Sequence, residues 1–248
     1  MNKEQELPEG WIRTTLGEIC SKPQYGWTTK ANHQSGLVKL LRTTDISRGS
    51  LDWDTVPYCT EIPESLAAYK LSEGDIVISR TGSMGFSYLI SSAPMDAVFA
   101  SYLIRFRPSD NVNACYIAYF LQTSQYWAFI NEQSAGVALV NVNARKLEAI
   151  KLPLAPFCEQ QRIVSAIEER FTILDAVTTA LQQNKQKLQL ARASVLKHAV
   201  EGKLTEKWRA EHPVTESGSQ LLERILAERR VKWEADQLAK GKAPRKLC

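Results

Sequence analysis

A chain of 248 residues with 44% hydrophobic and 23% charged residues has the composition of a folded protein, which excludes wholesale disorder. Its net charge is +4, yet residues 1–150 carry 13 Lys and Arg against 15 Asp and Glu, so the basic surplus follows residue 150. No apolar run approaches the ~20 residues of a membrane span. The start MNKEQELPEGW lacks an apolar signal core, so we expect a cytoplasmic protein.

Residues 1–155 are predicted to form one mixed α/β domain of the α+β class. Runs rich in β-branched and aromatic residues predict strands, and Asn113 is a plausible N-cap for a helix over Asn113–Glu132. A loop over Ser134–Asn143 leads to a last strand near Ala149–Leu152. The absence of a repeating βαβ unit disfavours a doubly wound sheet. The other predicted strands are Leu37–Arg42, Asp75–Ser79, Phe86–Ser91 and Ala97–Phe106.

Residues 156–202 are predicted to be one long helix. Glu159–Glu201 contains no Pro or Gly, follows Pro156 and ends at Gly202, which is the expected asymmetry of helix ends. Apolar residues seven apart form one seam, and Asn184 would fix the register of a coiled coil. The alternative is an amphipathic helix lying on its own domain. At ~1.5 Å per residue the helix is about 65 Å long, longer than such a domain is wide, which favours the coiled coil. The seam residues are Ile167, Leu174, Leu181, Leu188 and Val195.

Residues 203–248 are predicted to be a helical linker or tail. Lys203–Thr215 is polar, and Ser219–Ala239 interleaves basic and acidic residues at helical spacing. Such a charge-mixed helix most often presents a solvated face.

The stretch Val77–Gly85, VISRTGSMG, raises the possibility of a phosphate-binding loop. A Walker loop requires GxxxxGK[ST], but Gly82 and Gly85 are only three residues apart and Phe86 stands where the lysine is needed. Another predicted strand follows, so the stretch is interpreted as a hairpin tip. Common catalytic motifs are also missing. The five cysteines and three histidines show no ligand-like spacing, which predicts no metal site.

Two windows without acidic residues are the more informative charge pattern. Ile19–Thr44 and Gln133–Leu147 contain no Asp or Glu, while Lys, Arg, Asn, Thr and aromatic residues are interleaved in them. Basic side chains suit phosphates, and amide, hydroxyl and aromatic groups suit base edges. The alternative is a pair of polar surface loops whose charge is accidental.

Seven motifs, in order, resemble the specificity subunit (HsdS) of type I restriction–modification systems. The chain departs from that family, whose members usually carry two target-recognition domains, because it has one domain and one long helix. It is expected to be a natural half-subunit or a truncated chain. The motifs are LPEGW (7–11), LGEI (16–19), QYGWT (24–28), LRTTDI (41–46), EGDIVISRTGSMG (73–85), LPLAPFCEQQRIV (152–164) and EGKLTEKWR (201–209).

The resemblance implies a non-catalytic subunit that reads one half of a bipartite target on double-stranded DNA. Its long helix would act as a spacer and dock modification (methyltransferase) subunits, and two chains paired as a homodimer would read a palindromic interrupted site. S-adenosylmethionine, ATP and Mg are expected on the modification and restriction subunits, with no cofactor on this chain. Rival hypotheses are a stand-alone DNA-binding regulator, an enzyme and a structural protein.

The two acid-free windows and the turn at Arg80 are predicted to face DNA. Arg42, Lys39 and Arg80 are candidates for phosphate or guanine contacts, and Gln24, Tyr25, Thr28 and Asn141 for base edges. The full predicted set is Gln24, Tyr25, Thr28, Lys30, Lys39, Arg42, Thr43, Arg80, Ser83, Asn141, Asn143 and Lys146.

Overall fold

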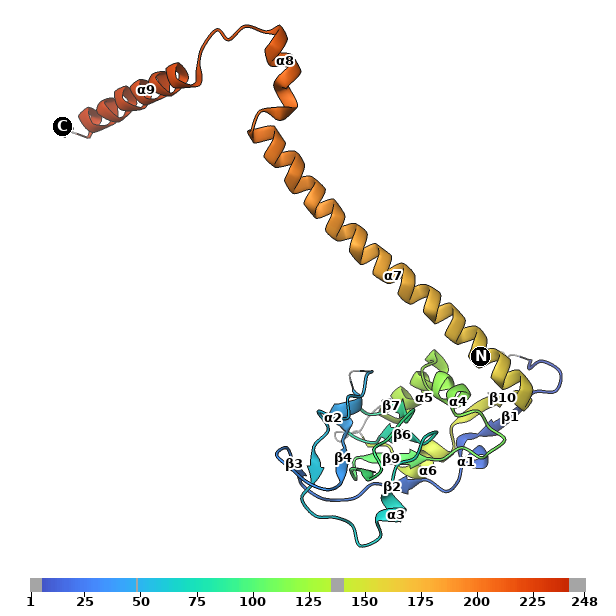
Figure 1. The fold of residues 1–248 in the computed structure, drawn as a ribbon. Helices are drawn as coiled ribbons and strands as arrows, with labels where there is room; N and C mark the ends of the chain where they lie inside the picture. Colours follow the sequence, from blue (N-terminus) through green and yellow to red (C-terminus); the bar gives the residue numbers. More distant parts are fainter. Residues whose placement is uncertain (1–5, 48, 135–140, 241–248) are drawn as a thin grey trace. The chain divides into compact units, whose positions relative to one another are not determined.

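The computed structural model describes residues 6–47, 49–134 and 141–240. The chain divides into two compact units, Met1–Ile173 and Leu174–Cys248. The first unit mixes strands with short helices and contains the start of the long helix α7 (Phe157–Val200); the second is helical (Figure 1). The predicted order of a mixed α/β domain, a long helix and a helical C-terminal segment is therefore confirmed.

A four-stranded antiparallel sheet forms the centre of the first unit. Its order is β2 (Gln24–Tyr25), β9 (Leu103–Phe106), β6 (Ile76–Ser79), β7 (Ser87–Leu89). Alternate side chains of β6 enter two different cores, because Ile78 packs in one hydrophobic cluster and Val77 in another. Burial on both faces explains why this strand is a continuous apolar run.

A second four-stranded sheet has the order β3 (Ala31–Asn32), β5 (Tyr58–Cys59), β4 (Lys39–Leu41), β8 (Ala97–Phe99). Its β4–β8 pair is parallel, with Leu40 opposite Val98. The short helices α2 (Thr43–Ile46) and α3 (Leu66–Tyr69) follow β4 and β5 in the chain.

The strand predicted over Ala97–Phe106 is two strands, β8 and β9, which belong to different sheets. The chain turns at 100–102, where Leu103 N donates to Ala100 O at 2.9 Å. Backbone groups at the break bond to Trp27 instead of continuing a ladder: Trp27 N donates to Phe99 O and Ser101 N donates to Trp27 O. The prediction was wrong because a partner distant in sequence supplies the hydrogen bonds that end the strand.

A two-stranded antiparallel sheet pairs β1 (Ile12–Thr15) with β10 (Lys151–Leu154). The last strand, expected near Ala149–Leu152, thus begins two residues later. Helix α1 (Leu16–Ile19) follows β1, and α6 (Ala144–Glu148) precedes β10.

The helix predicted over Asn113–Glu132 is also divided, into α4 (Ala114–Phe120) and α5 (Ser124–Ser134). Asn113 is the N-cap of α4, since its Oδ1 accepts from Cys115 N and Tyr116 N. Thr123 supplies a second cap, because its Oγ1 accepts from Tyr126 N at 3.4 Å. A hydroxyl that satisfies the free N–H groups of a new helix accounts for the interruption.

Helix α7 begins one residue after the start and ends two residues before the end of the helix predicted over residues 156–202. Gly202, with a φ of 77°, follows its last turn. Its first turn is anchored on the first unit by Gln160, whose side chain is 2% exposed. The Gln160 amide accepts from Asn113 N at 2.9 Å and donates to Ala155 O at 2.8 Å.

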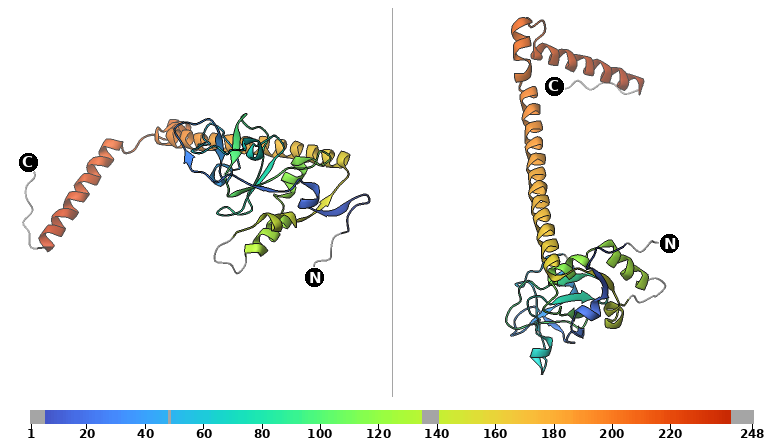
Figure 2. Two further views of the ribbon diagram at one scale, coloured as in Figure 1. Left: turned by 90° about the horizontal axis from the view of Figure 1, so that it is seen from below. Right: turned by 90° about the vertical axis from the view of Figure 1, so that its right-hand side faces the viewer.

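Beyond α7 the second unit contains a 3-10 turn (Lys203–Thr205) and helices α8 (Glu206–Glu211) and α9 (Gly218–Ala239). The sequence predicted α9 within one residue but gave no helix at α8. Helix α9 is one uninterrupted ribbon in both views of Figure 2, and Ser217 Oγ caps its start by accepting from Gln220 N.

Candidate nucleic-acid interface

Three predicted residues meet in space although they lie far apart in sequence. The Arg80 guanidinium carbon lies 4.9 Å from the centre of the Tyr25 ring, and Arg80 Nε donates to Asn141 Oδ1 at 3.2 Å. The Tyr25 hydroxyl accepts from Ala144 N at 2.9 Å, which ties it to the start of α6. We call Tyr25, Arg80 and Asn141 the Arg80 cluster. One residue from each acid-free window, Tyr25 and Asn141, therefore meets the turn after β6.

The strand register explains why Arg80 and Tyr25 share a face. Ile104 of β9 is opposite both Tyr25 of β2 and Ile78 of β6. Arg80 follows Ile78 by two residues, so it points to the same side of the sheet. Ile78 and Ile104 are fully buried in the core, whereas Arg80 lies just past its edge and is only partly covered. The result is a cation at the rim of an apolar core.

The motif QYGWT is held in place by contacts along its length. Gln24 Oε1 accepts from Arg105 Nη2, and Trp27 Nε1 donates to Glu61 O at 2.9 Å. At Gly26 the chain passes so close to the β8–β9 turn that an added Cβ would lie 2.2 Å from Ala100 O. Gln24, predicted as a base-edge reader, is therefore engaged within the protein, and glycine is the residue that permits the approach.

Gly26→Ala is expected to displace the β8–β9 turn from β2, because a Cβ at 2.2 Å from a carbonyl oxygen cannot be accommodated. Overpacking of this kind costs about 1–3 kcal/mol of unfolding free energy. Urea unfolding of the full chain measures it. Gly218→Ala is the control, since nothing lies within 4 Å of its Cβ position. Equal stability of the two variants would contradict the close approach.

The other predicted cations near this surface have partners in the chain. Arg42 bonds to the Asp45 carboxylate through Nη2 at 2.7 Å and Nε at 3.1 Å. Lys39 Nζ donates to Val56 O at 2.8 Å and lies 4.1 Å from the centre of the Tyr58 ring. Phosphate binding by Lys39 or Arg42 would compete with these contacts, whereas Lys30 is exposed.

The remaining predicted residues fall into two groups. Asn143 caps α6, with Oδ1 accepting from Lys146 N at 2.9 Å, and Thr43 Oγ1 accepts from Ser79 Oγ at 3.4 Å. Thr28 and Lys146 are exposed, and Ser83 is half-buried in the β6–β7 turn. Part of the second window, residues 135–140, lies outside the described residues.

The turn of VISRTGSMG joins two antiparallel strands, β6 and β7, which confirms the hairpin prediction. Gly85 has a φ of 81°, and a Cβ there would lie 2.8 Å from the Ile130 side chain. The buried Tyr126 hydroxyl donates to Gly85 O at 2.6 Å, and burial raises the pKa of Tyr126. Gly85 thus lets helix α5 lie against the hairpin.

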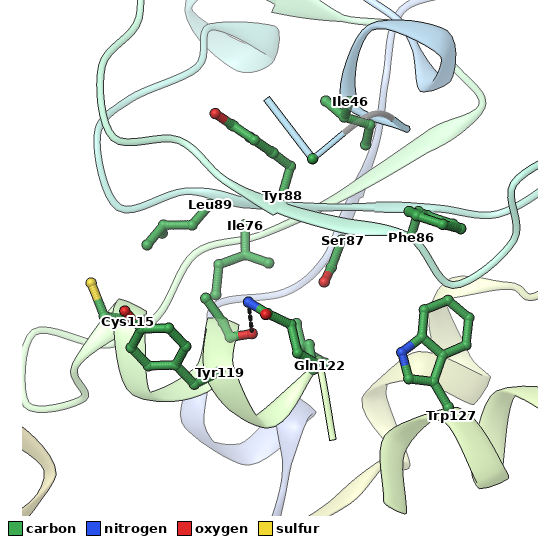
Figure 3. A pocket seen from close by; sticks show the side chains of 13 residues that line it. Ile46, Ile76, Phe86, Ser87, Tyr88, Leu89, Cys115, Tyr119, Gln122 and Trp127 are labelled. Carbon is green, nitrogen blue, oxygen red and sulfur yellow. Dashed lines mark hydrogen bonds between the residues drawn. The ribbon is translucent and has the colours of Figure 1, made fainter. Parts of the chain in front are cut away.

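A hollow of about 480 Å³ lies between β7 and helices α4 and α5 (Figure 3). Tyr119 lines it from α4 and Gln122 from the turn after α4. Phe86 and Trp127, whose ring centres are 5.5 Å apart, lie at one end. None of its lining residues is charged, so it offers no cation to a phosphate. No cluster of His, Cys, Asp or Glu able to hold a metal occurs among the described residues.

A buried ionic network that sequence analysis missed supports β2. Asp75 is fully buried and accepts from Arg107 Nε at 2.7 Å and Nη2 at 2.9 Å, with Arg105 Nη1 3.9 Å away. Burial lowers the pKa of Arg105, and Asp75 opposes that shift. Arg105 also donates to Gln24, the neighbour of Tyr25. The sequence did carry a signal for this network, because Arg105 is a charged residue within the apolar strand predicted over Ala97–Phe106.

The predicted seam of α7 divides between the two units. In the first unit, Ile167 is half-buried and lines a hollow with Tyr119 and Phe171, whose rings are 5.9 Å apart. In the second unit, the seam residues are exposed and Asn184 stands among them. The exposed fractions are 57% at Leu174, 64% at Leu181, 71% at Leu188 and 55% at Val195. A solvent-facing apolar row of this kind is typical of an interaction surface.

Comparison with known proteins places this arrangement in a family. The model of the type I restriction modification DNA specificity domain matches residues 8–191. The chain belongs to this family. It is 29% identical over 84% of its length to the type I restriction enzyme EcoKI specificity subunit of Escherichia coli (strain K12), covering 46% of that protein. The specificity-domain chain spans about half the length of the curated relatives it matches.

Solved structures share the fold of the specificity-domain chain. A crystal structure of the HsdS subunit from Thermoanaerobacter tengcongensis aligns with a TM-score of 0.57 and 20% identity, over 79% of this chain and 46% of that one. A chain from a study of complex assembly and conformational transition of the type I R-M system aligns with a TM-score of 0.61 and 19% identity, over 80% and 48%. No helix in the described ranges has the length and apolar character needed to cross a bilayer.

Proposed function

We propose that this chain is a non-catalytic DNA specificity subunit of a type I restriction–modification complex. Its first unit reads one half of a bipartite target on double-stranded DNA, and α7 docks modification (methyltransferase) subunits. Family membership over residues 8–191 supports this function. The observation that carries it is the Arg80 cluster, where a guanidinium, a phenol and an amide from three separate segments meet.

The chemistry of the Arg80 cluster suits groove readout. Arginine binds guanine edges or phosphates, and asparagine binds adenine edges. Asn141 holds Arg80 through Nε, and no residue in the described part of the chain bonds to the terminal guanidinium nitrogens of Arg80, which can therefore contact DNA. Since the ring of Tyr25 supports the guanidinium at 4.9 Å, the cation is oriented before DNA arrives, which lowers the entropic cost of binding.

We further propose that two chains pair through the α7 seam. Pairing would bury the exposed row Leu174, Leu181, Leu188 and Val195, and Asn184 would select the register. A two-fold pair presents two identical reading surfaces, which implies a palindromic, interrupted site. A helix of about 65 Å corresponds to roughly two turns of DNA at ~34 Å each.

Chemistry on DNA belongs, in this proposal, to partner subunits. The modification subunits bind S-adenosylmethionine and rotate the target adenine out of the duplex, because a stacked base is inaccessible. A restriction subunit uses ATP and Mg for cleavage. The chain would contribute the choice of sequence alone.

A map of N6-methyladenine across the source genome, with and without this gene, tests the function. Loss of methylation at one bipartite motif on deletion is the expected result, and a palindromic motif would support self-pairing. An asymmetric motif would contradict self-pairing and indicate a second reading domain. An unchanged map would reject the specificity function and favour a stand-alone DNA-binding regulator, which purified chain would reveal by sequence-specific binding without partners.

Arg80→Ala is expected to lower affinity for the specific duplex about 10- to 100-fold, which corresponds to ~1–3 kcal/mol for a base-reading arginine. Arg42→Ala is expected to weaken binding to all sequences alike and by less, because Asp45 already pairs with that guanidinium. Fluorescence anisotropy of the assembled complex on specific and scrambled duplexes, at one salt concentration, separates the two. If Arg80→Ala binds both duplexes with unaltered affinity, the Arg80 cluster is not part of the DNA interface.

A further inference from the structure

Tyr102, which the sequence did not single out, is the most exposed aromatic side chain among the described residues of the first unit, at 61%. It lies in the turn between β8 and β9, and its hydroxyl makes no hydrogen bond to any residue that the structure describes. A single exposed aromatic ring is common on protein surfaces, but this one offers both an apolar face and a hydroxyl to a ligand.

Tyr102 is a direct neighbour of Arg80. Arg80 N donates to Tyr102 O at 2.9 Å, which extends the β6–β9 ladder by one pair beyond Ser79 and Leu103. Residues opposite each other in an antiparallel pair have Cβ atoms about 4.5–5.5 Å apart on one face. Tyr102 therefore lies on the face of the sheet that carries Arg80 and Tyr25.

The turn that carries Tyr102 is fixed on both sides. Ser101 N donates to Trp27 O at 3.0 Å, and Gly26 N donates to Leu103 O at 3.2 Å. The close approach at Gly26 locks this turn against β2, as its hypothetical Cβ would lie 2.2 Å from Ala100 O. A side chain displayed on a rigid turn is pre-organised, as a residue that reads DNA should be.

We propose that Tyr102 is a specificity-determining residue that contacts DNA bases beside Arg80. Its hydroxyl donates to or accepts from a base edge, and its ring packs on the adjoining apolar edge, such as a thymine methyl. This inference rests on the proposed function, because it requires that the Arg80 surface face DNA. It adds to that function a base-contacting residue that lies outside both acid-free windows.

Two substitutions separate the hydroxyl from the ring. Tyr102→Phe removes only the hydroxyl, and Tyr102→Ala removes both. Met95→Ala is the matched control, since Met95 is 81% exposed in the same unit but belongs to no part of the cluster. Each full chain is purified with its modification subunits from the source organism. Binding is measured on the specific duplex and on duplexes altered at one base pair at a time.

Tyr102→Phe is expected to reduce discrimination about tenfold at one or two adjacent base pairs, and Tyr102→Ala by more, while non-specific binding is retained. Met95→Ala should behave as the unaltered complex. If both Tyr102 variants keep full discrimination while Arg80→Ala loses it, the role of Tyr102 is refuted and the proposed function stands. If the unaltered complex binds the specific and altered duplexes equally well, the role of Tyr102 and the proposed function are both refuted. Loss of the modification subunits from Tyr102→Ala alone would mark a protein contact and overturn the assignment.

Discussion

Replacing Asp75 with asparagine is expected to lower the free energy of unfolding by about 3–5 kcal/mol, the usual cost of leaving a buried charge without its partner. The Asp75 carboxylate accepts from Ser72 N at 2.8 Å and from two nitrogens of Arg107. Arg105, only 8% exposed, lies beside it. An amide at this position would leave two guanidinium groups facing each other without a counter-charge, and its NH₂ group would point a donor at other donors.

Urea unfolding of the full chain measures this loss as a lower midpoint at unchanged slope. Asp54→Asn is the control, because Asp54 is exposed and a surface change of this kind stays within about 0.5 kcal/mol. The effect should reach the Arg80 cluster as well, since Arg105 holds Gln24 beside Tyr25. A midpoint equal to that of Asp54→Asn would mean that the network contributes nothing to the stability of the fold.

The Leu181→Glu variant is expected to be monomeric and to lose its modification subunits. Leu181 is at the middle of the α7 seam and is 64% exposed in the single chain. In a pair the seam would be buried, and a glutamate there would replace the burial of a leucine with the desolvation of a charge. The combined cost is on the order of several kcal/mol for each chain.

Analytical ultracentrifugation gives the mass of the chain, and co-purification reports whether partners remain bound. Gln186→Glu is the matched control: it adds the same charge to the same helix five residues away, at a position that is not part of the seam. A variant at Leu181 that keeps the mass and partners of Gln186→Glu would refute the coiled coil. If Leu181→Glu loses the modification subunits but remains a dimer, Leu181 contributes to the docking of those subunits and is not required for pairing of the two chains.

Elements with a strong local signal were predicted closely. Helix α7 follows from an uninterrupted helical segment bounded by Pro156 and Gly202, and α9 from basic and acidic residues interleaved at helical spacing. The β6–β7 hairpin follows from an apolar strand and a glycine-containing turn. In these elements the hydrogen bonds close within a few residues, so nearby sequence is sufficient to specify them.

Elements whose partners are distant in sequence were missed or merged. Strands β2 and β3 are two residues each and exist because β9 and β5 pair with them. The break between β8 and β9 depends on Trp27, which lies more than 70 residues earlier. Short strands carry too little periodicity for detection, and their hydrogen bonds depend on the assembled fold.

The sequence by itself determined the family, the order of a mixed domain and a long helix, and the two windows from which acidic residues are excluded. Only the tertiary structure decided which of the predicted residues meet. Strand register brings Tyr25 and Arg80 together, and backbone pairing of Val142 with Arg80 brings Asn141 beside them. Arg42 and Lys39, in contrast, are engaged by Asp45 and Val56. Composition reports which side chains a segment offers, but the availability of each one depends on its neighbours in space. These neighbours are set by pairing and packing over the whole first unit.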